Sequence, residues 1–261
     1  MPESIIDIKQ VSKLFGGLTA VKQVDLQIPE EYIFSIIGPN GAGKTTLFNC
    51  ISGFYVPEKG EIQYLGESIQ GLSTNIIANL GISRTYQNIR LFSNLTAMEN
   101  ILIGLHNKLK SGCLNEIFHS GRHTQEEKES MEESIRLLEF IGLAGYGDYL
   151  ACNLPYGLQR RLEIGRALAN HPKVLLLDEP TAGMNIQEKQ VTMQFIQRLR
   201  DELGITIILI EHDMQVVMGI SDRIAVLDYG IKIAEGKVEE IQSNPKVIEA
   251  YLGPGGAALE E

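Results

Sequence analysis

The first third of the chain consists of short apolar runs separated by polar residues. Apolar and polar positions alternate at 4–10, 24–28 and 61–65, which predicts strands with one buried face. Residues 33–37 are almost entirely apolar, so this strand is expected to be buried on both faces. A helix is predicted from residue 44 to about Gly53. This part of the chain therefore combines antiparallel strands with one strand–loop–helix unit.

The middle of the chain has the period of helices. Thr96 and Glu99 have the spacing of a capping box and stand just before an apolar run. From 126 to 141, apolar residues recur at helical spacing and stop before Gly142. The intervening segment at 111–125 is polar and contains glycine, which indicates a loop or a broken helix. These features predict a lobe made mainly of helices.

The last third returns to alternating strands and helices. Apolar runs at 174–177 and 205–210 predict two buried strands, and the helix between them is expected to end at Gly204. Two further apolar segments, 224–227 and 231–234, flank a Tyr-Gly pair, which predicts a hairpin. The pattern as a whole is typical of an α/β protein.

The order of these patterns predicts the domain organisation. We expect a single domain over 1–253, with a core formed by 1–89 and 151–253. The helical lobe at about 90–150 is then an insertion into that core. The glycine-rich end of the chain, 254–261, is predicted to be a flexible tail.

Composition narrows the class of protein. Hydrophobic residues make up 44% of the 261 positions and charged residues 21%, which is the usual mixture of a globular protein. The net charge of −10 argues against broad binding to nucleic acid. The cysteines are odd in number and widely spaced, which indicates a reducing compartment. No apolar stretch approaches the length of a membrane span, so any pore must come from another chain.

The strongest chemical motif follows the strand at 33–37 directly. It reads Gly-Pro-Asn-Gly-Ala-Gly-Lys-Thr and has the spacing of a phosphate-binding loop. The glycines allow a tight turn whose N–H groups point at phosphate oxygens, Lys44 brings a positive charge to the β- and γ-phosphates, and Thr45 offers a hydroxyl to Mg²⁺. We therefore predict a nucleoside triphosphate site. Its residues are Gly38, Pro39, Asn40, Gly41, Ala42, Gly43, Lys44, Thr45 and Thr46.

Two carboxylates end the apolar strand at 174–177. Asp178 is expected to hold Mg²⁺ through a water molecule, and Glu179 is expected to accept a proton from an attacking water. A strand that simply ends in charged residues is the alternative. The phosphate-binding loop earlier in the chain favours the catalytic interpretation, because parallel strands deliver ligand-binding residues at their carboxyl ends.

A third motif resembles the signature of a known protein family. Residues 154–161, Leu-Pro-Tyr-Gly-Leu-Gln-Arg-Arg, open a helix before the carboxylate strand. Together with the phosphate-binding loop they resemble the ATP-binding cassette (ABC) family, whose signature usually reads L-S-G-G-Q, over almost the whole chain. The resemblance implies a mixed sheet with helices, an N-terminal antiparallel β part and an inserted helical subdomain. It also implies a head-to-tail dimer in which Gly157 approaches the ATP bound by the partner subunit.

The resemblance also implies roles for single residues. Phe15 corresponds to the aromatic residue that stacks on adenine, although its spacing also fits a buried core residue. Gln87 corresponds to the glutamine that contacts Mg²⁺ and the attacking water, and His212 to the histidine at the γ-phosphate. The implied catalytic residues are Glu179, His212, Lys44 and Gln87, and the implied Mg²⁺ ligands are Thr45, Gln87 and, through water, Asp178.

The sequence departs from the family pattern at four positions. Pro155, Tyr156 and Leu158 replace the serine, the first glycine and the glutamine of the signature. The hydroxyl of that serine is therefore missing. Asn185 stands where the family usually has aspartate. These changes indicate either a weaker composite ATP site or a subfamily variation.

The changed signature, together with 210–214 and 248–253, resembles the ATP-binding subunit of branched-chain amino acid importers. This implies an ATPase on the cytoplasmic face of the cell membrane that drives separate permeases. Its partners are a second ATPase subunit (the same chain or a paralogue), two permeases and, indirectly, a substrate-binding protein, with no nucleic acid. ATPases for lipid or lipopolysaccharide export and for urea or amide import share some of these features. The alternative from another functional class is a soluble ABC ATPase that acts in assembly or is associated with nucleic acid.

Overall fold

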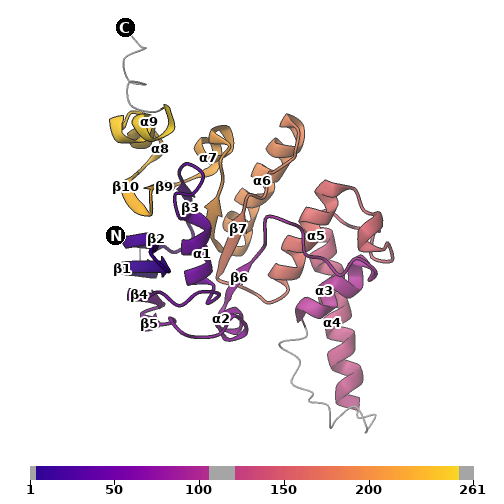
Figure 1. Cartoon of the computed structure of the whole chain (residues 1–261). Coiled ribbons are helices and arrows are strands. Elements are labelled where there is room, and N and C mark those ends of the chain that lie inside the picture. Colours follow the sequence, from indigo (N-terminus) through magenta and orange to yellow (C-terminus); the bar gives the residue numbers. More distant parts are fainter. Residues whose placement is uncertain (1–3, 106–120, 253–261) are drawn as a thin grey trace. The chain divides into compact units, whose positions relative to one another are not determined.

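A computed structural model of the chain describes residues 4–105 and 121–252 (Figure 1). Internal contacts divide the chain into two compact units. The first unit contains the described residues up to Arg84 and from Lys173 onward, and the second unit runs from Thr85 to Pro172. The second unit is longer than the lobe that the sequence predicts at about 90–150. The tail predicted at 254–261 lies outside the described residues.

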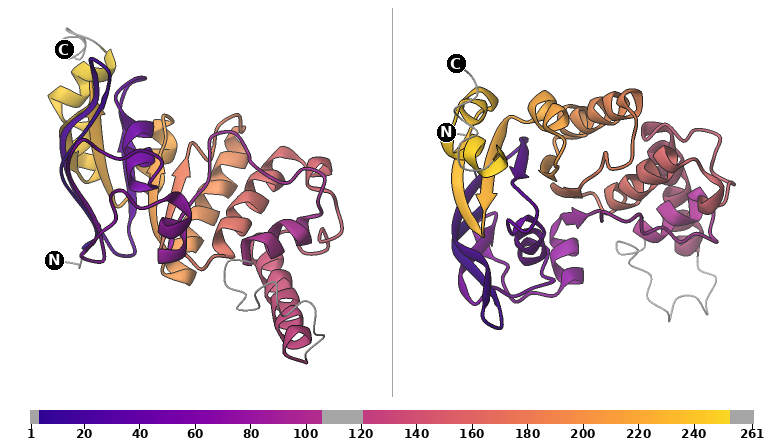
Figure 2. Two further views of the ribbon diagram at one scale, coloured as in Figure 1. Left: turned by 60° about the horizontal axis from the view of Figure 1, so that its bottom comes forward. Right: turned by 45° about the horizontal axis from the view of Figure 1, so that its top comes forward.

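The first unit contains an antiparallel sheet with the strand order β2-β1-β4-β5. Figure 2 shows its two long strands side by side. The alternating segments at 4–10, 24–28 and 61–65 all lie in strands, as predicted, apart from the last residue of the third. The strands of this sheet are β1 (Ser4–Phe15), β2 (Leu18–Pro29), β4 (Lys59–Tyr64) and β5 (Glu67–Ser68).

Irregular pairing explains why β1 and β2 are longer than predicted. The register between them shifts between Ile8 and Val11 and again near Lys13. Gln10 and Gln23 have left-handed φ values of 52° and 48° near these shifts. An extra residue in one strand reverses the apolar–polar phase while the two strands remain paired. The strict alternation of apolar and polar residues therefore ends before the strand ends.

The second sheet of the first unit has the order β10-β9-β3-β8-β7-β6. Its neighbours pair in parallel except for the β9–β10 hairpin. This mixed sheet confirms the predicted α/β class, and the hairpin confirms the interpretation of the Tyr-Gly pair. The strands are β3 (Ile33–Ile37), β6 (Ile82–Arg84), β7 (Val174–Asp178), β8 (Thr206–Ile210), β9 (Arg223–Asp228) and β10 (Ile231–Gly236).

The central strand β3 has a packed layer on each side. Phe34 and Ile36 belong to the core shared with the first helix and the antiparallel sheet. Ile37 packs on the opposite side with Val217 and Val247 of two later helices. The helices of this unit are α1 (Lys44–Ile51), α2 (Thr74–Leu80), α6 (Ile186–Leu203), α7 (Met214–Ile220), α8 (Val238–Gln242) and α9 (Pro245–Leu252).

Helix ends follow the capping rules where the sequence signals are strong. Gly204 ends α6 with a left-handed φ of 63°, as predicted. Helices α2, α7 and α8 were not predicted, because helices of five to seven residues are too short to show a helical period. Across the described ranges 4–105 and 121–252, no helix is both long enough and apolar enough to cross a membrane.

The second unit is helical, with α3 (Ala97–Leu105), α4 (Gly121–Phe140), the 3₁₀ turn η2 (Ala151–Asn153) and α5 (Tyr156–Leu168). The predicted capping box forms, since Glu99 N–H donates to Thr96 Oγ1 over 3.1 Å and Thr96 N–H donates to Glu99 Oε2 over 2.7 Å. Helix α4 begins at residue 121 instead of 126, so of the two interpretations of 111–125, a loop or a broken helix, the loop is wrong for the last residues. The remaining residues of that predicted loop lie outside the described ranges.

Candidate functional site

The phosphate-binding motif lies between β3 and α1, and close contacts require glycine at two of its positions. A Cβ on Gly38, whose φ is 147°, would lie 2.0 Å from the carbonyl oxygen of Leu227. A Cβ on Gly43, whose φ is 98°, would lie 2.3 Å from the carbonyl oxygen of Ala20. The loop is therefore held between β2 and the end of β9. Because no side chain fits at either position, backbone N–H groups can approach a ligand closely.

Lys44 is the positive charge of this loop. Its side chain is only 8% exposed. Its Nζ donates to the carbonyl oxygens of Gly38 over 2.6 Å and Pro39 over 2.9 Å. Burial lowers the pKa of Lys44, and the nearby charges of Glu179 and Asp178 act in the opposite direction. One ammonium and two carboxylates thus share the carboxyl end of the central sheet.

Asp178 is the last residue of β7, and Arg84 holds it in place. Arg84 Nη2 donates to Asp178 Oδ2 over 3.0 Å, and both side chains are nearly buried. Arg84 Nη1 donates to Asn49 Oδ1 over 2.7 Å and to Ser52 Oγ over 3.0 Å at the end of α1. Arg84 was not predicted to belong to the site. The sequence offered little signal for it, because β6 is only three residues long and its pairing with β7 is known from the structure.

Glu179 occupies an uncommon backbone conformation. Its φ is 46°, which few residues other than glycine and asparagine adopt. The conformation is held by the hydrogen bond from Glu179 N–H to the carbonyl oxygen of Ile210, over 2.9 Å. His212 Nδ1 lies 3.5 Å from Glu179 Oε1, and the imidazole is 61% exposed. Strained backbone of this kind is concentrated at functional sites.

A buried carboxylate, Glu211, joins the loops that carry these two residues. Its Oε1 accepts hydrogen bonds from Thr181 N–H over 3.0 Å and from Thr181 Oγ1 over 2.6 Å. Its Oε2 accepts a hydrogen bond from His212 N–H over 3.2 Å. The turns after β7 and β8 are thereby linked. This role was not predicted, and its signal in the sequence is a charged residue directly after a mainly apolar strand.

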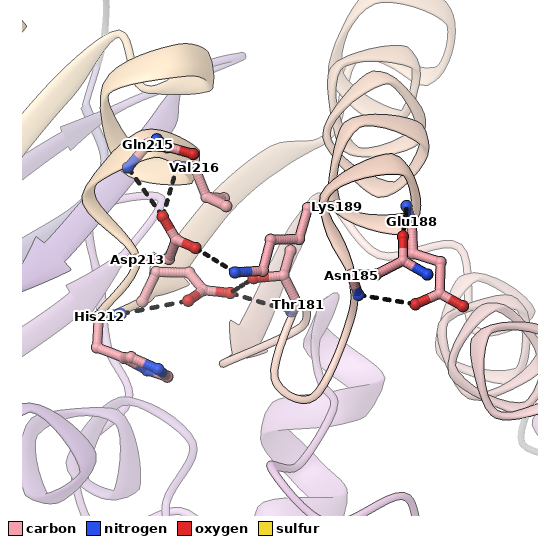
Figure 3. Close-up of polar contacts among 9 residues, drawn as sticks. Thr181, Asn185, Glu188, Lys189, His212, Asp213, Gln215 and Val216 are labelled. Atoms are coloured by element: carbon pink, nitrogen blue, oxygen red, sulfur yellow. Dashed lines mark hydrogen bonds and ion pairs between the residues drawn. The ribbon is translucent and has the colours of Figure 1, made fainter.

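Two further polar contacts start the helices that follow these turns (Figure 3). The Asn185 side chain accepts from Glu188 N–H over 3.0 Å, and Glu188 Oε2 accepts from Asn185 N–H over 2.9 Å, which makes a capping box for α6. Asp213 caps α7, and its hydrogen bond from Lys189 lowers its pKa. Asparagine caps a helix as well as aspartate does, which gives Asn185 a structural role.

Phe15 is the last residue of β1 and lies at the surface. It is 42% exposed, so the alternative interpretation as a buried core residue is wrong. Its ring packs edge to face on Tyr55 with centroids 5.1 Å apart. Lys13 Nζ lies 5.2 Å from the centroid of the Phe15 ring. The ring is therefore fixed by its neighbours and still accessible.

The remaining predicted residues lie in the second unit. Gln87 is exposed, and its carbonyl oxygen accepts a hydrogen bond from Arg160 Nη2 over 2.6 Å. Gly157 is in the first turn of α5, and among the described residues a Cβ there would meet no atom within 4 Å beyond its own turn of helix. The carbonyl oxygen of Pro155 accepts from Leu158 N–H and Gln159 N–H over 2.9 and 3.0 Å. The structure thus brings Lys44, Asp178, Glu179 and His212 together in the first unit, whereas Gln87, Gly157 and the rest of the changed signature belong to the second.

Comparison with protein families gives two matches. Residues 21–182 match the family described as ABC transporter. Residues 232–253 match the family described as branched-chain amino acid ATP-binding cassette transporter. The first match covers more than half of the chain and includes both the phosphate-binding motif and the two carboxylates.

Individual proteins agree with these families. The chain is 46% identical over 253 residues to the high-affinity branched-chain amino acid transport ATP-binding protein BraF of Pseudomonas aeruginosa, which covers 97% of this chain and 99% of that one. It resembles the solved ADP conformation of MJ1267, an ATP-binding cassette of an ABC transporter, with 32% identity and a TM-score of 0.84 over 97% of this chain and 100% of that one. It also resembles MJ0796, a dimeric post-hydrolysis cassette bound to ADP and Pi, with 29% identity and a TM-score of 0.74 over 89% and 98%.

Proposed function

Because the chain belongs to the ABC transporter family and is an ATP-binding, ATP-hydrolysing cassette, we propose that it drives the import of branched-chain or related amino acids. The substrate class is supported by the similarity to BraF over 97% of the chain and by the second family match at 232–253. The observation that supports the chemistry best is the meeting of Lys44, Asp178 and Glu179 at one end of the central sheet.

The phosphate groups of ATP bind in the loop from Gly38 to Thr46. The loop offers N–H groups around two glycines that admit no side chain, and the positive end of α1 faces the same place. Lys44 exchanges its two backbone acceptors for phosphate oxygens. A buried ammonium is attracted to phosphate more strongly than an exposed one, because water screens it less.

The donors present fit Mg²⁺, which takes oxygen ligands and few protein side chains. Thr45 offers a hydroxyl and Asp178 a carboxylate whose orientation Arg84 fixes, and the resemblance to the family implies an amide oxygen from Gln87 as a further ligand. In the described ranges no group of three or more His, Cys, Asp and Glu side chains forms a separate metal site. Held by these residues, Mg²⁺ would supply positive charge that offsets the negative charge of the phosphates of ATP.

Glu179 accepts the proton of the attacking water, and His212 and Gln87 orient that water and the γ-phosphate. The carboxylate of Glu179 is partly exposed, so water can reach it. The hydrogen bonds of Glu211 hold the turns of both Glu179 and His212. Such fixed positions lower the cost of reorganisation during the reaction.

Two subunits close on two ATP molecules, and Gly157 of each approaches the nucleotide of the other. The open space around its Cβ position supports this arrangement, as does the dimer formed by MJ0796. A glycine that no contact of its own chain requires is well placed for close approach of a ligand. The second subunit is the same chain or a paralogue.

Gly157→Ala is expected to separate stability from function. The folded chain should gain roughly 0.4–1 kcal/mol, since alanine restricts the unfolded chain and meets no atom here. ATP-dependent dimerisation of the Glu179→Gln background, followed by light scattering, should weaken about tenfold. Gly165→Ala is the contrast, because its Cβ would lie 2.6 Å from Ile141 Cδ1 and should lower the melting temperature. Unchanged dimerisation in Gly157→Ala would contradict its proposed role.

Phe15→Ala should weaken ATP binding through the loss of stacking on adenine. We expect a loss of about 0.5–1.5 kcal/mol in affinity and little change in melting temperature, because the ring is 42% exposed. Phe15→Tyr should bind normally. Phe54→Ala removes another exposed aromatic that contacts Tyr55 and serves as the control. Equal effects of Phe15→Ala and Phe54→Ala on affinity, measured by calorimetry, would rule out adenine stacking on Phe15.

The proposed partners are two permeases and, through them, a substrate-binding protein, with the chain on the inner face of the cell membrane. The test is transport in ATP-loaded vesicles that contain this chain and the permeases that co-purify with it from detergent-solubilised membranes. Leucine and valine should be taken up only with the wild-type chain, and urea should not. Uptake of urea, or stimulation of the ATPase by lipid alone, would contradict the amino-acid assignment while leaving the ATPase activity intact.

A further inference from the structure

A buried ion pair lies in α5, just after the changed signature. Arg160 Nη1 donates to Glu163 Oε2 over 2.8 Å, and each side chain is 1% exposed. Burying two charges costs several kilocalories of desolvation, and apolar residues at such positions often give equal or greater stability. A contribution to stability is therefore a weak explanation for this ion pair. Its hydrogen bonds to the backbone indicate another role.

The pair is attached to both ends of the segment 86–90, which carries Gln87. Arg160 Nη1 donates to the carbonyl oxygen of Tyr86 over 2.6 Å, and Arg160 Nη2 donates to that of Gln87 over 2.6 Å. At the other end, Arg90 N–H donates to Glu163 Oε1 over 2.9 Å. The Arg90 guanidinium also lies 4.3 Å from the centroid of the Tyr86 ring, which closes the segment on itself.

The geometry of the arginine makes this attachment specific. A guanidinium presents its N–H groups in one rigid plane, so Arg160 holds two successive carbonyl oxygens and a carboxylate at once. A lysine has donors on a single nitrogen and cannot reproduce that fork. Helix α5 and the Gln87 segment are therefore fixed to each other by directional bonds in the second unit.

We propose that Arg160 and Glu163 are positioning residues that make the Gln87 segment and the first turn of α5 move as one body. This inference rests on the proposed function, in which Gln87 faces the ATP of its own chain and Gly157 faces the ATP of the partner. A shift of Gln87 at one nucleotide is then transmitted to the signature at the other. The two ATP sites of a dimer are coupled inside each chain by one ion pair.

The test uses the full chain with the double variant Arg160→Met/Glu163→Leu, which removes both charges and leaves neither one buried alone. Amide exchange of Arg90, measured by NMR or mass spectrometry without nucleotide, should rise about tenfold or more. The affinity for ATP should stay within about twofold of the wild-type value, whereas kcat for ATP hydrolysis should fall about tenfold or more. This combination indicates an effect on the positioning of catalytic groups and not on ATP binding.

Two variants complete the experiment. Arg198→Met/Glu202→Leu removes an exposed ion pair of α6 that is joined over 2.7 Å, and should change neither exchange at 86–90 nor kcat. Arg160→Lys keeps the charge and should show increased exchange and a reduced kcat even if the double variant does not fold.

Unchanged exchange of Arg90 would overturn the attachment. Increased exchange with an unchanged kcat would overturn the positioning role and leave a purely structural pair. Failure of the proposed function looks different, because the wild-type chain itself would then fail to support amino-acid uptake while the exchange results stayed as predicted.

Discussion

Glu179→Gln is expected to bind ATP normally and to hydrolyse it about 10²–10⁴ times more slowly. Glutamine keeps the size of the side chain but cannot accept the proton of the attacking water. The backbone at this position should not change, because the hydrogen bond from Glu179 N–H to Ile210 is independent of the side chain. Single-turnover hydrolysis with saturating ATP and Mg²⁺ measures the effect directly.

The same variant should accumulate as an ATP-bound dimer, since closure is no longer followed by hydrolysis. Gel filtration with ATP should show this dimer, and ADP should not produce it. Glu67→Gln alters an exposed carboxylate of β5 and is the control. Rapid turnover by Glu179→Gln would mean that the general base is another residue.

Lys44→Ala is expected to abolish measurable hydrolysis and to weaken nucleotide binding. The site loses the only cation of the phosphate-binding loop, and removal of one charged or polar stabiliser of a transition state commonly costs about 10²–10³ in rate. The carbonyl oxygens of Gly38 and Pro39 also lose their donor, so the loop itself should become less ordered. Steady-state ATPase rates and binding of a fluorescent nucleotide measure the two effects.

Lys22→Ala, at an exposed position of β2, is the control for a lost positive charge. It should keep the wild-type rate and affinity. Near-normal hydrolysis by Lys44→Ala would contradict the assignment of the phosphate-binding loop as the catalytic site.

Elements and motifs formed by neighbouring residues could be predicted from the sequence. The strand at 33–37 was predicted with its observed bounds, because a short, almost entirely apolar run next to a glycine-rich turn is typical of a buried strand that leads into a loop. The strands at 174–177 and 205–210 differ from the observed ones by a single residue at one end. The exposed position of Phe15 required the structure, since the spacing of residues fits a surface and a core position equally well.

The residues that hold the site residues in place could not be predicted from the sequence, because their partners are distant in sequence. Arg84 meets Asp178, Glu211 meets Thr181, and Arg160 meets the backbone of Gln87. Each is a charged residue within or next to a helix or strand, and the sequence alone does not show which distant group it contacts. Their function becomes evident once the sheet order and the packing of α5 are known.

The strand order of the central sheet also has a consequence for biosynthesis. The phosphate-binding motif leaves the ribosome early, but its strand β3 lies between β8 and β9, which end only at Ile210 and Asp228. Residues 85–172, made in between, form the contiguous helical unit. Pairing over such long separations is slow, and both edges of an apolar strand remain exposed meanwhile. A nascent chain that stops before β9 therefore leaves one edge of β3 unpaired, and we expect it to bind ATP only after β9 has been made and has paired with β3.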